Sequence, residues 1–150
     1  MSIGGVIINI LSNNDAAYIA GIIDGEGSIG VMSQHHNTEN KTSTYRLRLR
    51  VTNTHLGVIE WLRLKIGCGN INLIKKPLKH YRQAYELAWS GLTAINIIRQ
   101  LYPYMIIKRN QAEVAFEFER TLDEPTWSLP DSIVECRKKL RKKMIDLNNS

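Results

Sequence analysis

The sequence predicts an α+β fold with the element order αββαββα, in which helices cover one face of an antiparallel sheet. Three observations favour this class. Segments of strand character and helix character follow one another along the 150 residues. Residues 44–53 alternate between polar and apolar side chains almost perfectly, which is typical of a strand with one buried face. Residues 55–66 instead carry apolar side chains at the spacing of an amphipathic helix.

The elements can be placed in order along the chain. A first helix is expected from Ala16 to Gly25, with Asn13, Asn14 and Asp15 as candidate N-cap residues. Four strands are expected, at 28–36, 44–53, 70–75 and 81–89. Further helices are expected at 55–66, 92–101, 106–121 and 131–148. On the last strand hydrophobicity places Trp89 in the core, although stacking on a nucleic-acid base is the alternative.

Length and composition limit the class of protein. We expect a single domain spanning 1–150, with an N-terminal arm at 1–14 and a basic C-terminal helix at 131–148. The net charge of +6 favours a polyanionic partner. The two cysteines form neither a disulfide framework nor a zinc-binding pattern, which favours a reducing, intracellular setting. No apolar run is long enough to span a bilayer, so no membrane association is expected.

An arginine ladder on strand 44–53 indicates a nucleic-acid interface. Arg46, Arg48 and Arg50 share one face of the strand, where they repel one another unless a polyanion lies opposite. Arginine binds phosphates and guanine edges in a bidentate manner, so we expect double-stranded DNA on this face rather than solvent alone. Further candidate DNA contacts lie on the other strands and their connections: Met32, Gln34, His36, Asn70, Asn72, Lys75, Lys76, Lys79 and Arg82.

The first helix combines a smooth face with two acids at its end. Ala17, Gly21 and Gly25 recur every four residues, so they share one face that another backbone can approach closely. Gly21 costs about 1 kcal/mol relative to alanine in a helix interior. Asp24 and Glu26 oppose the helix dipole, and a hard divalent cation is the natural group to stabilise them. The plain alternative is a core helix with a glycine C-cap.

The segment 19–27, IAGIIDGEG, resembles the LAGLIDADG motif of homing endonucleases. One copy is present, and single-motif chains of that family are homodimers. The resemblance therefore implies that the motif helix packs against a second copy of the chain through Ala17, Gly21, Asp24 and Gly25. It also implies a saddle-like sheet and an intron-encoded enzyme that makes a double-strand cut in a long pseudo-palindromic DNA site.

The resemblance also assigns roles in the chemistry. It implies that Glu26 binds catalytic metal. Because the carbonyl of Gly25 is a candidate added ligand and all the ligands are then oxygens, Mg²⁺ is the expected ion. About two or three ions per dimer are implied, with Mn²⁺ expected to substitute and Ca²⁺ expected to bind without cleavage. Asn53 matches a polar position that orders water, and Lys108 matches a lysine near the active site. The family usually has aspartate where Glu26 stands. The Glu26 carboxylate therefore lies one methylene farther from the backbone than the usual aspartate. Asp24 is expected to be structural, either at the helix end or across the dimer axis.

Two function classes stay open after these observations. One is the site-specific endonuclease, and the other is a non-cleaving nucleic-acid binder, such as an intron maturase or a DNA-binding regulator on the same scaffold. Glu26, Asn53 and Lys108 together favour the enzyme. The basic run 137–143 either follows the DNA backbone or is a solvated helix face. No small-molecule substrate is expected.

Overall fold

One antiparallel sheet with the strand order β1-β2-β4-β3 organises the protein. The structure is a computed structural model, and it describes residues 7–35, 43–75, 82–123 and 129–150. It confirms the predicted α+β class and element order. The elements are α1 Asn13–Glu26, β1 Gly27–His35, β2 Ser43–Asn53, α2 Leu56–Ile66, β3 Asn70–Ile74, β4 Ala84–Ser90, α3 Gly91–Leu101, η1 Tyr102–Tyr104, α4 Arg109–Glu119, η2 Arg120–Asp123 and α5 Asp131–Asn148.

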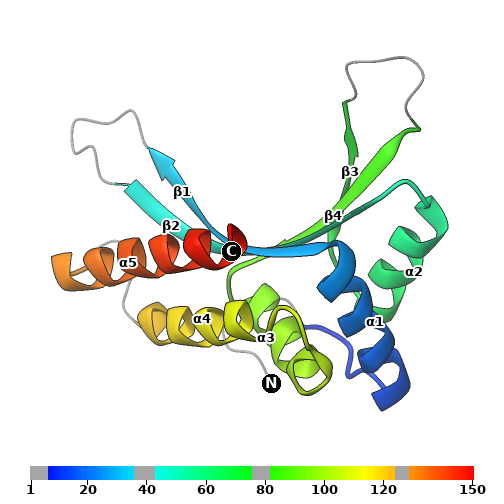
Figure 1. Cartoon of the computed structure of the whole chain (residues 1–150), viewed down its shortest axis with the longest axis horizontal. Coiled ribbons are helices and arrows are strands. Elements are labelled where there is room, and N and C mark those ends of the chain that lie inside the picture. Colours follow the sequence, from blue (N-terminus) through cyan, green and yellow to red (C-terminus); the bar gives the residue numbers. More distant parts are fainter. Residues whose placement is uncertain (1–6, 36–42, 76–81, 124–128) are drawn as a thin grey trace.

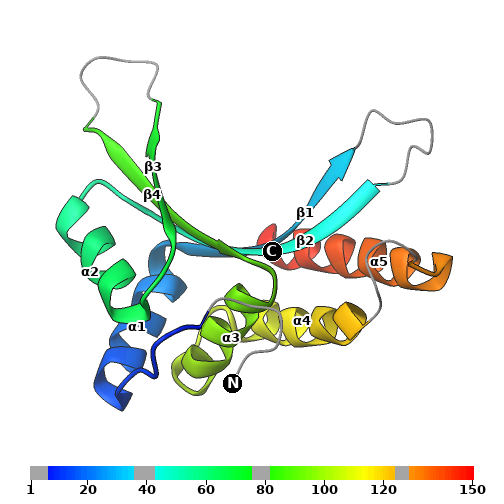
Figure 2. The ribbon, with the colours of Figure 1, turned by 180° about the vertical axis from the view of Figure 1, so that it is seen from behind.

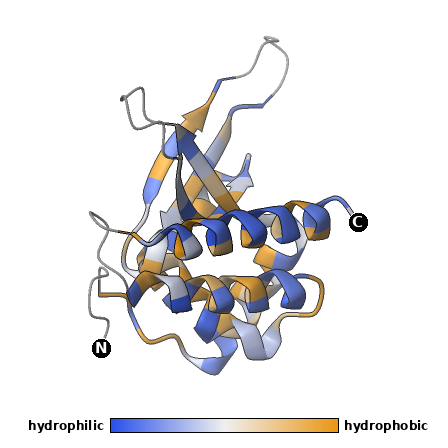
Figure 3. Ribbon diagram, turned by 90° about the vertical axis from the view of Figure 1, so that its left-hand side faces the viewer, coloured by the Kyte–Doolittle hydropathy of each residue, from blue (hydrophilic) through white to orange (hydrophobic). Residues whose placement is uncertain are grey.

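The sheet has an open face and a covered face. Its two hairpins, β1–β2 and β3–β4, splay apart like the sides of a saddle, and the helices lie together beneath them (Figures 1 and 2). Polar residues predominate along α5, which lies below the β1–β2 hairpin (Figure 3). No helix in the described ranges is both long enough and apolar enough to cross a bilayer.

The core lies between the sheet and the helices because the strands place alternate side chains on opposite faces. Leu47, Leu49 and Val51 of β2 are fully buried. They belong to one cluster with buried residues of α1, α2, α3, α4 and α5. Trp89 is 4% exposed, and its Nε1 donates a hydrogen bond to the Cys68 carbonyl at 2.8 Å. The core interpretation of Trp89 is therefore confirmed.

The junction between α1 and β1 has no connecting residue. Ser12, rather than the three residues after it, caps α1 by accepting a hydrogen bond from the Asp15 amide at 3.1 Å. The helix then runs to Glu26, and Gly27 already belongs to β1. A Cβ atom on Gly27 would lie 2.9 Å from both the Cα and the carbonyl oxygen of Ile23. Only glycine lets the strand leave the helix so closely.

The predicted helix 106–121 is shorter than expected at both ends. Pro103 lies in the 3₁₀ turn η1, and α4 begins only at Arg109. Between them the backbone amides of Ile106 and Lys108 donate to the Asp24 side chain instead of forming helical bonds. The tertiary contact therefore overrides the apolar helical pattern. Smaller differences are that β4 runs from 84 to 90 and that the Ser90 side chain makes no cap hydrogen bond.

The described part of the N-terminal arm is fastened to two helices. The Asn9 amide donates to the Ile66 carbonyl at 2.8 Å, at the end of α2. The Gln100 side chain of α3 accepts from the Leu11 amide at 2.8 Å and donates to the Asn9 carbonyl at 3.0 Å. These bonds tie α2 and α3 together on the side away from the open sheet face.

Candidate active site and nucleic-acid interface

Glu26 and Asn53 meet where α1 and β2 end. The Asn53 Nδ2 donates a hydrogen bond to Oε2 of Glu26, whose side chain is exposed. The Asn53 Oδ1 accepts from the His55 amide at 2.8 Å, which fixes which end of the side-chain amide faces Glu26. His55 is itself held, because its Nδ1 accepts from the Val58 amide at 3.0 Å as the N-cap of α2. The start of α2 thus orients the amide that faces the acid.

Asp24 faces the interior of its own chain. The residue is 9% exposed, and its two carboxylate oxygens accept hydrogen bonds from the Ile106 amide at 2.8 Å and the Lys108 amide at 3.1 Å. These bonds hold the connection between η1 and α4 against the end of α1. Of the two positions expected for Asp24, the structure shows the helix end. Its contribution to a dimer interface stays a prediction.

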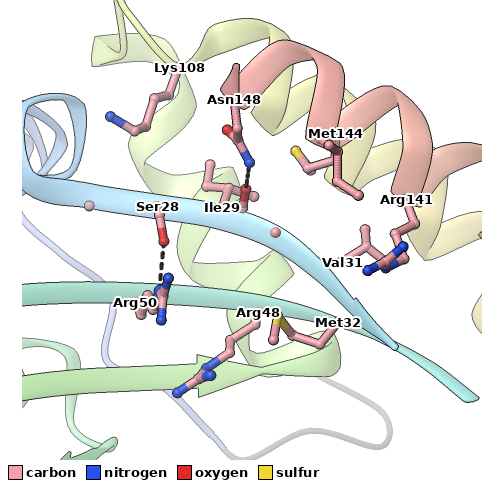
Figure 4. A pocket seen from close by; sticks show the side chains of 13 residues that line it. Ser28, Ile29, Val31, Met32, Arg48, Arg50, Lys108, Arg141, Met144 and Asn148 are labelled. Carbon is pink, nitrogen blue, oxygen red and sulfur yellow. Dashed lines mark hydrogen bonds between the residues drawn. The ribbon is translucent and has the colours of Figure 1, made fainter. Parts of the chain in front are cut away.

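Lys108 lies at the same helix end. Its Nζ donates to the backbone carbonyl of Asp24 at 2.6 Å. Carbonyls in the last turn of a helix lack helical partners and carry partial negative charge, so an ammonium group is favourable there. Figure 4 shows the side chain reaching from the chain before α4 toward the end of α1. Lys108 is therefore close to the junction that carries Glu26, and its role in the chemistry stays a prediction.

The donor set at this end of α1 suits a hard cation. Glu26 supplies an exposed carboxylate, and the carbonyl of the exposed Gly25 lies one residue before it. Both donors are oxygens, the ligand type that Mg²⁺ prefers. Within the described ranges no three His, Cys, Asp or Glu side chains gather in one place. Among the described residues, Glu26 is thus the exposed carboxylate at this end of α1, since the Asp24 side chain is buried.

The arginine ladder faces away from the core, as predicted. Arg46 and Arg50 are exposed and Arg48 is half-buried, whereas the intervening side chains are fully buried. Arg48 forms an ion pair with Glu86 of β4 at 2.6 Å, and Arg50 approaches the same carboxylate at 3.6 Å. The Arg50 Nε also donates to Ser28 Oγ at 3.0 Å. These contacts restrain the guanidinium groups of Arg48 and Arg50 on the sheet.

Glu86 is the residue of this surface whose ion pairs the sequence does not predict. Like charges on one strand face are expected to repel unless a polyanion lies opposite. The structure instead supplies part of the counter-charge internally from β4. The alternation of β4 already places Glu86 on the outward face, but its partners depend on the register that aligns it with Thr52. That register joins segments more than thirty residues apart and cannot be read from local pattern.

The other candidate DNA contacts divide into described and undescribed residues. Met32 is aligned with Arg46, and Gln34 is aligned with Thr44, so both share the outward face of the sheet. Asn72 is aligned with Glu86 on that face, and Asn70 lies two residues before it. Lys75 and Arg82 are exposed beyond the ends of β3 and β4. His36, Lys76 and Lys79 lie outside the described residues.

The small-residue face of α1 is open in the single chain. Ala17, Gly21 and Gly25 are exposed, and a Cβ atom built on either glycine would meet no atom within 4 Å. Ile106 and Ile107 are 83% and 68% exposed, and the Ile106 amide is bonded to Asp24 of the same helix. Large apolar side chains exposed in this way are typical of an interaction surface.

Comparisons with solved structures agree with this geometry. The homing endonuclease I-CvuI, in complex with its target in the presence of Ca, has a TM-score of 0.74 at 21% identity, covering 88% of this chain and 80% of that chain. The archaeal intron-encoded homing endonuclease I-Vdi141I, complexed with DNA, has a TM-score of 0.73 at 19% identity, covering 90% and 84%.

A longer protein also matches. The LAGLIDADG homing endonuclease I-SmaMI bound to cleaved DNA has a TM-score of 0.69 at 18% identity, covering 93% of this chain and 46% of that chain. At the level of sequence, no protein-family model and no characterised protein matches the chain. The motif at 19–27, the saddle-like sheet and these similarities together show that the chain has the fold of the LAGLIDADG homing endonucleases.

Proposed function

We propose that the protein is a site-specific endonuclease that acts as a homodimer and makes a metal-dependent double-strand cut in a long pseudo-palindromic DNA site. One observation carries this proposal: the exposed acid Glu26 directly precedes the strand that pairs with the arginine ladder. A group able to bind metal is thus placed at the margin of a basic surface. The similar structures I-CvuI and I-SmaMI were solved with DNA, the latter with cleaved DNA.

The open face of the sheet is the proposed DNA-binding surface. Arg46, Arg48 and Arg50 present planar donors that suit phosphates and guanine edges. Asn70 and Asn72 on β3 add amides that suit adenine. Glu86 restrains two of the arginines before DNA arrives, which lowers the entropy lost when they bind. Binding surface and restraint therefore come from neighbouring strands of one sheet.

The proposed chemistry is hydrolysis of a DNA phosphodiester. Glu26 and the Gly25 carbonyl would hold Mg²⁺, which when bound activates water and neutralises charge on the phosphate. Asn53 keeps the Glu26 carboxylate in one orientation through its own bond to the His55 amide. The Lys108 ammonium, held at the end of α1, adds positive charge that favours an anionic transition state.

The second copy of the chain would complete the site. The exposed small-residue face of α1 and the exposed Ile106 and Ile107 are the apolar margin that we assign to this contact. Burying this margin against its twin would bring two Glu26 side chains toward one axis. Close carboxylates repel, so bound cations and dimerisation would support each other. Two strands of duplex DNA would then meet one acid each.

Two measurements test the proposal. Sedimentation at micromolar concentration should give twice the 17.2 kDa mass of the chain. A plasmid library that carries randomised sites should yield linear product in Mg²⁺, with binding but no cutting in Ca²⁺. Duplex binding in Mg²⁺ without any linear product from the library would instead identify a non-cleaving DNA binder. A chain that stays single on duplex DNA would contradict the dimer.

A further inference from the structure

The basic residues of α5 have different surroundings, although they form one run in the sequence. Arg137 is 6% exposed, and it donates from Nε to the Thr121 Oγ1 at 2.9 Å and from Nη2 to the Thr121 carbonyl at 2.8 Å. Burial lowers the pKa of this guanidinium from its usual value. Lys143 pairs with Glu117 of α4 at 3.1 Å. These two cations are therefore engaged in holding α5 against η2 and α4.

Arg141 is placed differently. It is half-buried, and its Nε is a buried donor with no hydrogen-bond partner in the described part of the chain. Leaving a buried donor unpaired costs about 1–3 kcal/mol, more for a charged group, so an acceptor at this position is favoured. Figure 4 shows the Arg141 side chain extending from α5 toward β1. The acceptor that suits it must enter the space between these two elements.

A groove of about 480 Å³ occupies that space. Arg48, Arg50, Lys108 and Arg141 line it, and its lining residues include no Asp or Glu. Glu86 offsets part of the charge of the two sheet arginines, and within the described ranges it forms no ion pair with Arg141. The excess positive charge makes an anion the ligand that fits.

The groove follows the open edge of the sheet. β1 is one of the two outer strands, so one of its edges has no strand partner among the described residues. The Asn148 side chain fastens the last turn of α5 to this edge by donating to the Ile29 carbonyl at 2.9 Å. Because Arg48 and Arg50 belong to both the groove and the outward sheet face, the groove is continuous with the proposed DNA-binding surface.

Further basic residues of α5 lie on the helix face that borders the groove. Lys138, Arg141, Lys142 and Ile145 stand at positions i, i+3, i+4 and i+7, which share one face of a helix. Ile145 lines the groove, so this face of α5 borders it. Both lysines are exposed. A DNA backbone that passes along the groove would therefore meet Lys138 and Lys142 as well as Arg141.

We propose that the groove between β1 and α5 binds a backbone phosphate of duplex DNA through Arg141, with Lys138 and Lys142 beside it. The inference rests on the proposed function, because it takes DNA on the arginine face as the source of the phosphate. It extends the footprint from the sheet to the edge strand and the last helix. Phosphate contacts of this kind position the duplex and set affinity without reading sequence.

The test compares two variants of equal charge on one helix. Arg141→Gln removes the proposed ligand, whereas Lys139→Gln removes a charge from an exposed position outside the groove lining. Affinity for a duplex of mixed sequence is measured by fluorescence anisotropy at several salt concentrations. Each phosphate contact contributes about 0.9 to the slope of log K against log[salt], so Arg141→Gln should reduce the slope by about one. Lys139→Gln should leave the slope unchanged.

Equal slopes for the two variants would overturn the inference. A loss of affinity in Arg141→Gln that is seen with duplex RNA but not with duplex DNA would also overturn it. A second measurement uses the unmodified sequence, in case Arg141→Gln does not fold. Phenylglyoxal modification followed by mass spectrometry should show that duplex DNA protects Arg141 and leaves the exposed Arg120 reactive. Equal reactivity of Arg141 with and without DNA would overturn the inference. Neither readout needs cutting, so failure of the endonuclease proposal in the plasmid assay is a separate result.

Discussion

The two sides of α1 differ in how complete they are within one chain. The inner side carries Ile19, Ile23 and Asp24, whose side chains are buried and, for the acid, fully hydrogen-bonded. The outer side carries Gly21 and Gly25, which are exposed. A Cβ atom added to either glycine would meet no atom within 4 Å. The inner side is buried by the fold, whereas the outer side is left uncovered by the described residues.

The contrast is sharpest for the two acids. Asp24 and Glu26 are separated by one residue, yet one fixes backbone amides and the other is exposed beside the Asn53 amide. A solvated helix face normally carries long charged side chains rather than glycines. One turn of helix therefore carries two acids in different surroundings. The inward acid holds backbone amides of its own chain, and the outward acid is exposed, as our proposal of a metal ligand requires.

The largest expected effect is on cutting by the outer acid. Glu26→Gln removes the charge but keeps the size of the side chain and an acceptor for Asn53. Cleavage of plasmid should fall to background, while affinity for duplex DNA persists and the free energy of unfolding changes by no more than about 0.5 kcal/mol. Cutting that survives in Mg²⁺ would show that Glu26 is not the metal ligand.

The inner acid should show the reverse pattern. Asp24→Ala leaves the part-buried amides of Ile106 and Lys108 without their acceptors. Urea unfolding should show a loss of about 2–3 kcal/mol. The matched control is Glu26→Ala, which loses an exposed side chain and should cost at most about 0.5 kcal/mol. Equal losses for the two variants would remove the distinction between the two sides.

A smaller effect tests how Glu26 is held. Glu26→Asp and Asn53→Gln each change the reach of the contacting pair by one methylene, in opposite directions. Each single variant should cut more slowly, and the double variant should recover most of the rate, with a coupling of about 1 kcal/mol or roughly fivefold.

The control for the exchange is Asn53→Ala combined with Glu26→Asp. Alanine cannot donate to the shortened acid, so this pair should show no recovery. A double exchange that cuts no better than the slower single variant would show that the hydrogen bond between the two side chains does not orient the acid.

The smallest effect concerns the outer face itself. Gly21→Ala adds a methyl group into open space, and the gain in helix propensity should stabilise the dissociated chain by up to about 1 kcal/mol. Sedimentation equilibrium should nevertheless show weaker self-association, because the methyl groups keep two helices apart. Gly27→Ala is the contrasting glycine variant, since its added Cβ clashes with the chain's own Ile23 and should destabilise the fold directly. Unchanged association of Gly21→Ala would argue against a helix-to-helix interface.

The strands could be predicted well because their period is unambiguous. Alternation along 44–53 assigns the arginines to one face and the apolar residues to the other, and burial confirms both assignments. The ion pair between Arg48 and Glu86 was not predictable, because it depends on pairing across a long insertion that includes α2 and β3. Local pattern thus gives the face of a residue but not its partner.

Helix limits and helix-borne charges were harder to predict. The apolar residues 106 and 107 extend the pattern of α4, but bonds to Asp24 keep them out of the helix. Arg137 belongs to a basic run, yet it is buried and donates twice to Thr121. In the candidate site, Glu26, Asn53 and Lys108 were found through resemblance to a motif, and the structure adds how each side chain is held. Their chemical roles stay predictions.

The direct passage from α1 into β1 ties the acid to the sheet as one rigid part. Because no residue separates Glu26 from the first strand residue, inserting one amino acid there would turn every following side chain of β1 to the opposite face. Deleting one would do the same. If the open sheet face reads DNA as proposed, adaptation to a new DNA sequence is therefore expected through substitutions along the strands, while the spacing between Glu26 and β1 stays constant.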